Sequence, residues 1–303
     1  MVQWSISKHM DLDEIFGSYS RKMIQLCLYQ RAMNDTAKKE LEKLSEYEKA
    51  IENILELKEH STLSHHSMAF RIASSGEHFF YGQKKLSVKD KQISVDLHKN
   101  KQYQWLLSEA YEEFEDCIER LYAYAGFINN DFWPLKDYGA ITLSEIENKD
   151  FNWFEEQATN KKDTPASIIN KFRSSFPNIM KIEEKNELGV NLRLAITLIE
   201  HLRHVIVHRG GTVLDKNKFR YNILKKCGLL NNGNIAEEHT QFIDGFLGSG
   251  DYEKTIFLLE VPINQKIPQG AYINVLDKLT GYLMAYVHLI YVSIKTSHNK
   301  HIN

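Results

Sequence analysis

One segment of the chain ends in side chains that could bind a phosphate and move a proton beside it. Arg203 and His208 are separated by four residues, His204 directly follows the arginine, and Gly210-Gly211 closes the segment. An unperturbed imidazole titrates near neutral pH and can give or accept a proton. A guanidinium presents a planar fork of donors that matches phosphate oxygens. These residue types predict acid–base chemistry at a phosphate.

The spacing of Arg203 and His208 limits how they can cooperate. On a helix the two residues project about 140° apart and lie about a turn and a half from each other along the axis. They can therefore flank one cleft, but they cannot form a compact pair on one helical face. We expect two copies of this helix to meet across a dimer axis, so that arginines and histidines from both copies converge.

The segment Arg203-His204-Val205-Ile206-Val207-His208 resembles the R-x4-6-H motif of the HEPN superfamily. In that family the residue after the arginine is commonly Asn, Asp or His, and His204 satisfies this. The motif closes the third helix of a four-helix core before a small or glycine-containing turn, which Gly210-Gly211 matches. The resemblance covers residues 101–295 and leaves residues 1–95 unassigned.

The resemblance implies a metal-independent endoribonuclease that needs no cofactor and acts as a homodimer with a composite site. Its catalytic residues would be Arg203, His204 and His208. The 2′-hydroxyl of the RNA attacks its own phosphate, which requires a base, an acid and positive charge at the phosphorane. Which histidine is the acid stays open. The family implies a toxin or antiphage-defence effector, restrained by an antitoxin or a regulatory partner protein.

The alternative within the same resemblance is a non-catalytic module. In that case Arg203 and His208 would hold a nucleotide, an RNA end or a partner protein without cleaving anything. A further alternative is structural, because positive side chains at the end of a helix interact favourably with its macrodipole.

A basic window follows the motif. From Arg203 to Cys227 the chain has seven basic residues and one acid, a formal charge of +6, with Phe219 and Tyr221 placed to stack on bases. The substrate-binding residues that we predict are Arg209, Lys216, Lys218 and Arg220. The whole chain carries a formal charge of -2, so positive charge does not cover its entire surface.

Metal chemistry is a weaker interpretation. His201, His204 and His208 stand at i, i+3 and i+7, a spacing that would suit Zn²⁺, but the H-E-x-x-H pattern is missing. Further histidines (His60, His65, His66 and His78) fit surface positions better. The acidic run from Glu109 to Glu119 fits the solvated face of an amphipathic helix better than a Mg²⁺ site. We therefore predict no metal.

Composition indicates the class and the compartment. Only 5 Pro and 15 Gly in 303 residues favour helices over many short strands. The three cysteines are widely spaced, which fits a reducing compartment. Residues 1–15 lack the apolar stretch of a signal peptide, and the most apolar run, residues 282–294, is too short to span a bilayer. We expect a cytoplasmic protein without a membrane segment.

The expected fold is all-α, with a HEPN-like four-helix core, a helical N-terminal extension and at most a short β-strand near 255–261. We assign residues 1–95 to the N-terminal region and residues 96–303 to the HEPN-like domain with its motif helix at 188–209. The core helices are expected at 101–127, 164–176, 188–209 and 271–295. Other helices are expected at 13–60, 64–83, 217–227 and 235–247, and a loop at 84–100.

Overall fold

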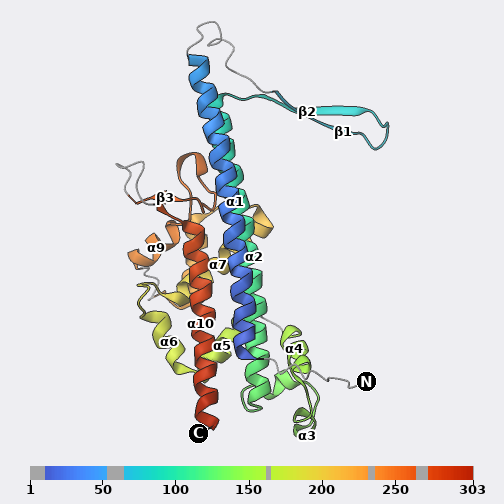
Figure 1. The fold of residues 1–303 in the computed structure, drawn as a ribbon, viewed down its shortest axis with the longest axis vertical. Coiled ribbons are helices and arrows are strands. Elements are labelled where there is room, and N and C mark those ends of the chain that lie inside the picture. Colours follow the sequence, from blue (N-terminus) through green and yellow to red (C-terminus); the bar gives the residue numbers. More distant parts are fainter. Residues whose placement is uncertain (1–10, 53–64, 162–164, 231–235, 264–271, 303) are drawn as a thin grey trace, which may run out of the picture. The chain divides into compact units, whose positions relative to one another are not determined.

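The protein is mainly helical, as expected (Figure 1). The computed structural model describes residues 11–52, 65–161, 165–230, 236–263 and 272–302. These residues form two compact units, one comprising residues 28–103 and the other comprising the residues before and after that range. The two longest helices, α1 (Leu12–Glu52) and α2 (Val88–Ile128), contribute residues to both units. No helix in the described part of the chain has an apolar stretch that could cross a bilayer.

The larger unit contains every helix expected for the core. The helix α7 (Leu192–Arg209) packs against α8 (Lys216–Cys227), α10 (Val275–Ile302) and α6 (Pro177–Glu184), and α5 (Ala166–Ser175) packs against α6. The second half of α2 supplies large side chains that are fully buried, among them Tyr111, Phe114 and Tyr122. The hydrophobic stripe along α2 therefore faces the core, as its sequence periodicity predicts.

Both ends of α7 follow from local sequence. The side chain of Asn191 accepts a hydrogen bond from the backbone N–H of Leu194 at 2.9 Å, so the helix begins at Leu192 rather than near Leu188. Gly210 ends the helix in the left-handed conformation, with φ 59° and ψ 27°. A Cβ on Gly211 would lie 2.2 Å from the side-chain oxygen of Gln104, so this position requires glycine. The predicted glycine stop is confirmed.

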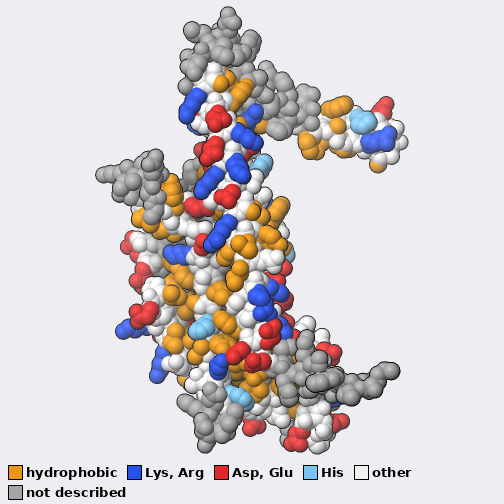
Figure 2. All heavy atoms as spheres, in the orientation of Figure 1, with side chains coloured by type: hydrophobic (Ala, Val, Ile, Leu, Met, Phe, Trp, Pro, Cys, Tyr) orange, Lys and Arg blue, Asp and Glu red, His pale blue; other side chains and the backbone are white. Residues whose placement is uncertain are grey.

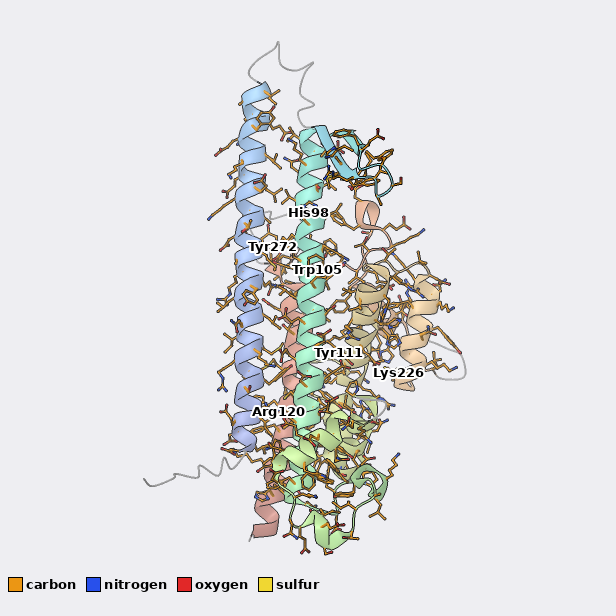
Figure 3. The ribbon with its side chains drawn as sticks, turned by 90° about the vertical axis from the view of Figure 1, so that its right-hand side faces the viewer. His98, Trp105, Tyr111, Arg120, Lys226 and Tyr272 are labelled. Carbon is orange, nitrogen blue, oxygen red and sulfur yellow. The ribbon has the colours of Figure 1, made fainter. Side chains whose placement is uncertain are left out.

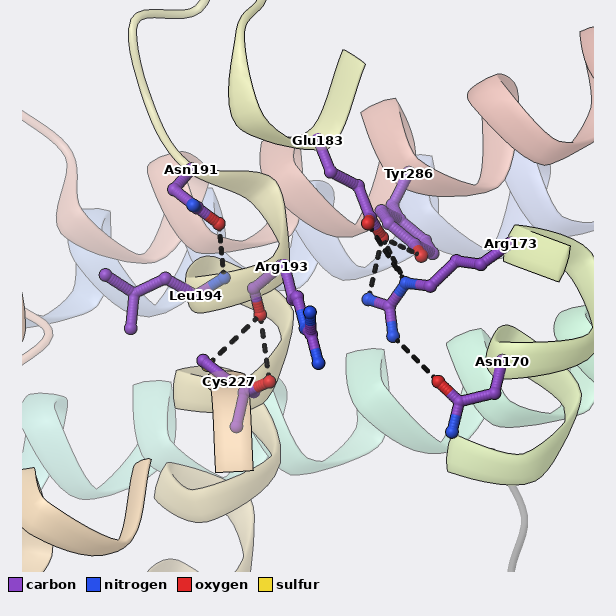
Figure 4. A network of polar contacts seen from close by, with 9 residues as sticks. Asn170, Arg173, Glu183, Asn191, Arg193, Leu194, Cys227 and Tyr286 are labelled. Atoms are coloured by element: carbon purple, nitrogen blue, oxygen red, sulfur yellow. Dashed lines mark hydrogen bonds and ion pairs between the residues drawn. The ribbon is translucent and has the colours of Figure 1, made fainter. Parts of the chain in front are cut away.

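A buried ion pair joins three helices of the same unit (Figure 4). The Nε of Arg173 on α5 donates to both carboxylate oxygens of Glu183 on α6, at 2.8 and 3.0 Å. The hydroxyl of Tyr286 on α10 donates to the same carboxylate. Glu183 is only 2% exposed, so this carboxylate depends on its two partners for the hydrogen bonds that water would otherwise make.

Shorter elements connect these helices. They are the 3-10 helices η2 (Leu135–Tyr138) and η3 (Gly250–Tyr252), the helices α3 (Leu143–Ile146), α4 (Phe151–Thr159) and α9 (Glu237–Asp244), and the strands β3 (Val261–Pro262) and β4 (Tyr272–Ile273). The prediction of a strand at 255–261 is mostly wrong. Thr255 and Ile256 form only isolated bridges, and β3 begins at Val261. Pro177 opens α6, a helix that we did not predict. The core helix expected at 164–176 corresponds to α5, which begins at Ala166, and residue Thr164 lies outside the described residues.

The smaller unit corrects two expectations. Residues 64–83 were expected to be helical, but His65–Arg71 (β1) and His78–Lys85 (β2) pair as an antiparallel hairpin. Hydrophobic side chains lie along this hairpin, and Met68, Phe70, Phe79, Phe80 and Tyr81 are exposed (Figure 2). The physical reason is that the turn at Gly76, with φ 74°, interrupts the helical period and lets aromatic residues pair across strands.

The loop expected at 84–100 is also wrong beyond its first residues, since α2 begins at Val88. Ser87 starts this helix: the side chain of Asp90 accepts from the backbone N–H of Ser87 at 2.9 Å, and the Ser87 hydroxyl accepts from the N–H of Asp90 at 3.1 Å. This reciprocal cap stabilises a helix start whose charged sequence lacks clear hydrophobic periodicity. The helix expected at 13–60 is confirmed as far as Glu52, and its remainder lies outside the described residues.

Candidate functional site

The motif residues occupy the last two turns of α7. The Nη2 of Arg203 lies 3.2 Å from a carboxylate oxygen of Glu112 on α2. The Nε of Arg203 is buried and has no hydrogen-bond partner among the described residues. The side chain of Arg203 is 30% exposed and that of Glu112 is 59% exposed. The guanidinium therefore lies against α2, beside a carboxylate that is largely in solvent.

His204 and His208 lie together on the exposed side of α7. Their ring centroids are 4.6 Å apart, with the ring planes inclined at 52°. Both side chains are exposed. One helical turn separates them, which allows the rings to meet. The structure thus brings the two predicted histidines together, while the predicted arginine faces α2.

His201 does not join this pair. Its ring Nδ1 lies 2.9 Å from the carbonyl oxygen of Thr197, which accepts the N–H, and its ring lies edge-on to Phe219 on α8. Burial lowers the pKa of His201, so the neutral form is favoured. No group of three His, Cys, Asp or Glu side chains in the described part of the chain is placed to hold a metal ion. His201 therefore lies apart from the pair of His204 and His208, and the three rings do not converge.

The α2 face beside Arg203 is acidic and partly buried. Glu115 is half-buried, and its burial raises the pKa of the carboxyl to about 7. Arg203 opposes this pKa shift, whereas Glu119, Glu200 and Glu112 add to it. We expected the run Glu109–Glu119 to be a solvated face, and for Glu115 this is wrong. The signal that would have identified Glu115 is its position one turn after Glu112 on the face of α2 that meets the motif.

The predicted substrate-binding residues divide into two groups. Lys216 donates to the carbonyl oxygen of Gly248 at 3.0 Å, and Arg220 binds the two carboxylate oxygens of Asp244 at 2.6 and 2.8 Å. The side chains of Arg209 and Lys218 make no hydrogen bond or ion pair with any described residue. Of these four residues, only Arg220 is paired with a carboxylate among the described residues, because Lys216 binds a neutral carbonyl and Arg209 and Lys218 have no side-chain partner there.

Apolar side chains are exposed near the motif. Trp105 of α2 is 61% exposed, Val207 of α7 is 50% exposed, and Leu214 after α7 is 68% exposed. Trp105 and Val207 line the same cavity of about 580 Å³, together with Glu112. Figure 3 labels Trp105 on α2. An exposed apolar group of this kind beside a polar site is typical of a surface that binds another molecule.

Comparison with known proteins finds no relative: no protein-family model, no curated protein and no solved structure matches this chain. What the protein does is therefore inferred from the residues of α7 and their neighbours. The strongest features there are the histidine pair, the arginine beside Glu112 and the exposed apolar residues around them.

Proposed function

We propose that this protein is a HEPN-like, metal-independent endoribonuclease that acts as a homodimer with a composite site. The observation that carries the proposal is the end of α7, where His204, directly after Arg203, packs against His208 in solvent. The left-handed Gly210 then ends the helix directly after these residues. The combination of R-x4-H spacing, paired exposed imidazoles and a glycine stop supports this function better than a helix cap alone.

The pair of imidazoles suits cleavage of RNA by its own 2′-hydroxyl. One neutral imidazole accepts the proton of the 2′-hydroxyl as its oxygen bonds to phosphorus. The other, protonated, donates a proton to the departing 5′-oxygen as the bond from phosphorus to that oxygen breaks. The products are a 2′,3′-cyclic phosphate and a 5′-hydroxyl. A guanidinium stabilises the charge that gathers on the phosphorane.

The placement of Arg203 supports a dimeric site. Within one chain Arg203 faces α2, whereas His204 and His208 face solvent. A second copy of α7 approaching the histidine pair would add its own cations and confine the substrate between two motif helices. The exposed Trp105, Val207 and Leu214 offer apolar surface for such an approach.

In the cell, a growth-inhibiting ribonuclease would act in the cytoplasm as a toxin or antiphage-defence effector. Such an activity needs restraint, so an antitoxin or a regulatory partner protein belongs to this proposal. The alternative is a non-catalytic module that binds a nucleotide, RNA or a partner protein through the same residues. Arg203 lies against α2 while His204 and His208 face solvent, which favours this alternative because cleavage needs the guanidinium and the imidazoles at one phosphate.

Incubation of the purified full-length protein with single-stranded RNA in EDTA distinguishes the two functions. We expect the wild type to cut, and Arg203→Ala to be slower by about 100-fold or more, the size typical for loss of one transition-state donor. Arg31→Ala, which removes an exposed arginine of α1, is the matched control and should cut normally. RNA binding without cleavage by the wild type would favour the non-catalytic module.

A further inference from the structure

A second cationic feature lies on α7, before the motif. A cavity of about 130 Å³ is lined by residues of α5, α7 and α8 and by one residue of α2. Its charged lining residues are Arg173, Arg193 and Lys226 against one acid, Glu200. None of these belongs to the R-x4-H segment. We call this cavity the α5–α7 pocket.

The cations of the α5–α7 pocket are only partly neutralised. Arg173 is bound to Glu183 behind the pocket, and its Nη1 donates to the side-chain oxygen of Asn170 at 3.1 Å. Lys226 is bound to Glu200. The guanidinium of Arg193 makes no hydrogen bond or ion pair with any residue that the structure describes, although it lines the same cavity as Arg173 (Figure 4). With Arg173 paired to Glu183 and Lys226 paired to Glu200, Arg193 is the cation of this lining that has no carboxylate partner among the described residues, and its charge favours an anion in the cavity.

A buried hydroxyl supplies an independent observation. Tyr111 is 1% exposed, lines the α5–α7 pocket, and its hydroxyl has no hydrogen-bond partner among the described residues. A buried hydroxyl that has lost its hydrogen bonds to water and gained no partner is energetically unfavourable. Burial raises the pKa of Tyr111, which keeps the hydroxyl protonated as a donor. A ligand oxygen in the cavity would satisfy it.

The volume of the pocket limits the ligand. At about 130 Å³ it is well below the roughly 300–1,000 Å³ of sites that enclose drug-sized molecules, so a whole nucleotide would not fit inside. A tetrahedral oxyanion is small enough, and its oxygens match the donor fork of Arg193 and the Tyr111 hydroxyl, while Arg173 keeps its bonds to Glu183. The polar side chains of the lining come from α2, α5, α7 and α8 and so surround the cavity. A carboxylate has only two oxygens and would reach fewer of them than a phosphate.

We propose that the α5–α7 pocket binds a phosphate group, held chiefly by Arg193 with the Tyr111 hydroxyl as a further donor, beside the paired cations Arg173 and Lys226. The group can come from free phosphate or from the terminal phosphate of a nucleic acid strand. Arg193 precedes Arg203 by ten residues on α7, about 15 Å along the helix axis. A strand end held here would lie two to three nucleotides from the motif. This site is separate from the proposed ribonuclease chemistry and stands without it.

Calorimetric titration of the full-length protein tests the proposal with two probes. The first is inorganic phosphate. The second is a 2′-O-methyl trinucleotide with a 5′-phosphate, compared with the same trinucleotide bearing a 5′-hydroxyl. Because a 2′-O-methyl strand cannot be cut by 2′-hydroxyl attack, the result does not depend on the ribonuclease proposal.

We expect saturable binding of at least one phosphate probe, weakened by about 10-fold or more in Arg193→Gln and by several-fold in Tyr111→Phe. Lys181→Gln removes an exposed charge from α6 and should bind normally. Binding of the 5′-phosphorylated strand, but not of the 5′-hydroxyl strand, identifies a strand end as the source, and binding of inorganic phosphate alone identifies free phosphate.

Failure of both probes to saturate, or wild-type affinity in both folded variants, would overturn the proposal. Thermal melting checks that each variant folds, and Tyr111→Phe decides if Arg193→Gln does not fold.

Discussion

The guanidinium of Arg203 lies 3.2 Å from the carboxylate of Glu112, and its own Nε is buried without a hydrogen-bond partner among the described residues. The arginine is thus held against α2 by one largely exposed carboxylate. A phosphate that approaches the motif must compete with this carboxylate. Exposed pairs of this kind contribute about 0.2–1 kcal/mol, so substrate can displace Glu112.

Glu112→Gln should therefore tighten RNA binding. Removal of the competing charge is expected to lower the dissociation constant by about 1.5- to 5-fold, the equivalent of that pair energy. Fluorescence anisotropy with labelled RNA measures the effect, in the His208→Ala background so that the RNA stays intact. Glu109→Gln removes an exposed carboxylate from the same helix and is the control. An equal gain in both variants would mean that net charge alone is responsible.

Glu115 should make stability depend on pH. Its pKa is raised to about 7 in the folded protein, chiefly by burial, whereas an unfolded chain has the ordinary value near 4.5. Between these two values the folded state binds more protons than the unfolded state, so stability falls as pH rises from about 4.5 to about 7. Glu115→Gln should flatten this decline, as measured by urea denaturation across the range. An unchanged profile in Glu115→Gln would show that other groups cause the decline.

The buried ion pair between Arg173 and Glu183 should be essential for stability. Glu183→Ala leaves Arg173 without its carboxylate and Tyr286 without its acceptor, in a place where Glu183 is 2% exposed. Breaking one partner of such a pair typically costs about 3–5 kcal/mol. Chemical denaturation measures the loss. Glu184→Ala, at the exposed neighbouring position, should change stability by less than about 0.5 kcal/mol. Similar losses in the two variants would contradict this assignment.

Val207→Glu should prevent the proposed dimer. Val207 is 50% exposed on α7 between the motif residues, and a carboxylate there would have to be desolvated in an apolar interface. We expect a monomer by analytical ultracentrifugation and loss of RNA cleavage. Val292→Glu, at a position of α10 that is 41% exposed, is the matched control. A Val207→Glu monomer that still cuts RNA would show that one chain contains a complete site.

Sequence patterns predicted the elements that local signals define. The spacing of hydrophobic residues along α7 and the glycine at its end can be recognised from residues close together in the sequence. The same is true of the hydrophobic stripe of α2 between residues 101 and 127. The hairpin at 65–85 was predicted as a helix because its aromatic residues are spaced in a way that also fits a helical period. The positive φ of Gly76, which makes the turn, is what separates the two strands. The start of α2 does not follow from hydrophobic periodicity, because the segment is charged and the reciprocal cap of Ser87 and Asp90 sets where the helix begins.

The candidate site was predictable only in part. The motif residues and the contact of His204 with His208 follow from positions one turn apart on a single helix. The partners of Arg203, the raised pKa of Glu115 and the α5–α7 pocket depend on how helices distant in sequence pack together. Likewise, the +6 charge of residues 203–227 did not reveal that Arg220 binds Asp244 and Lys226 binds Glu200. A charge count does not identify which cations have partners.

Analysis of the RNA ends after incubation in EDTA tests the central claim most directly. We expect the wild type and His98→Ala, which removes an exposed histidine elsewhere on α2, to produce fragments with 2′,3′-cyclic phosphate and 5′-hydroxyl ends. His208→Ala should fold normally and cut more slowly by about 100-fold or more, the range for loss of a general acid or base. Cleavage that survives His208→Ala, or that appears only after a divalent metal is added, would contradict the proposed ribonuclease mechanism.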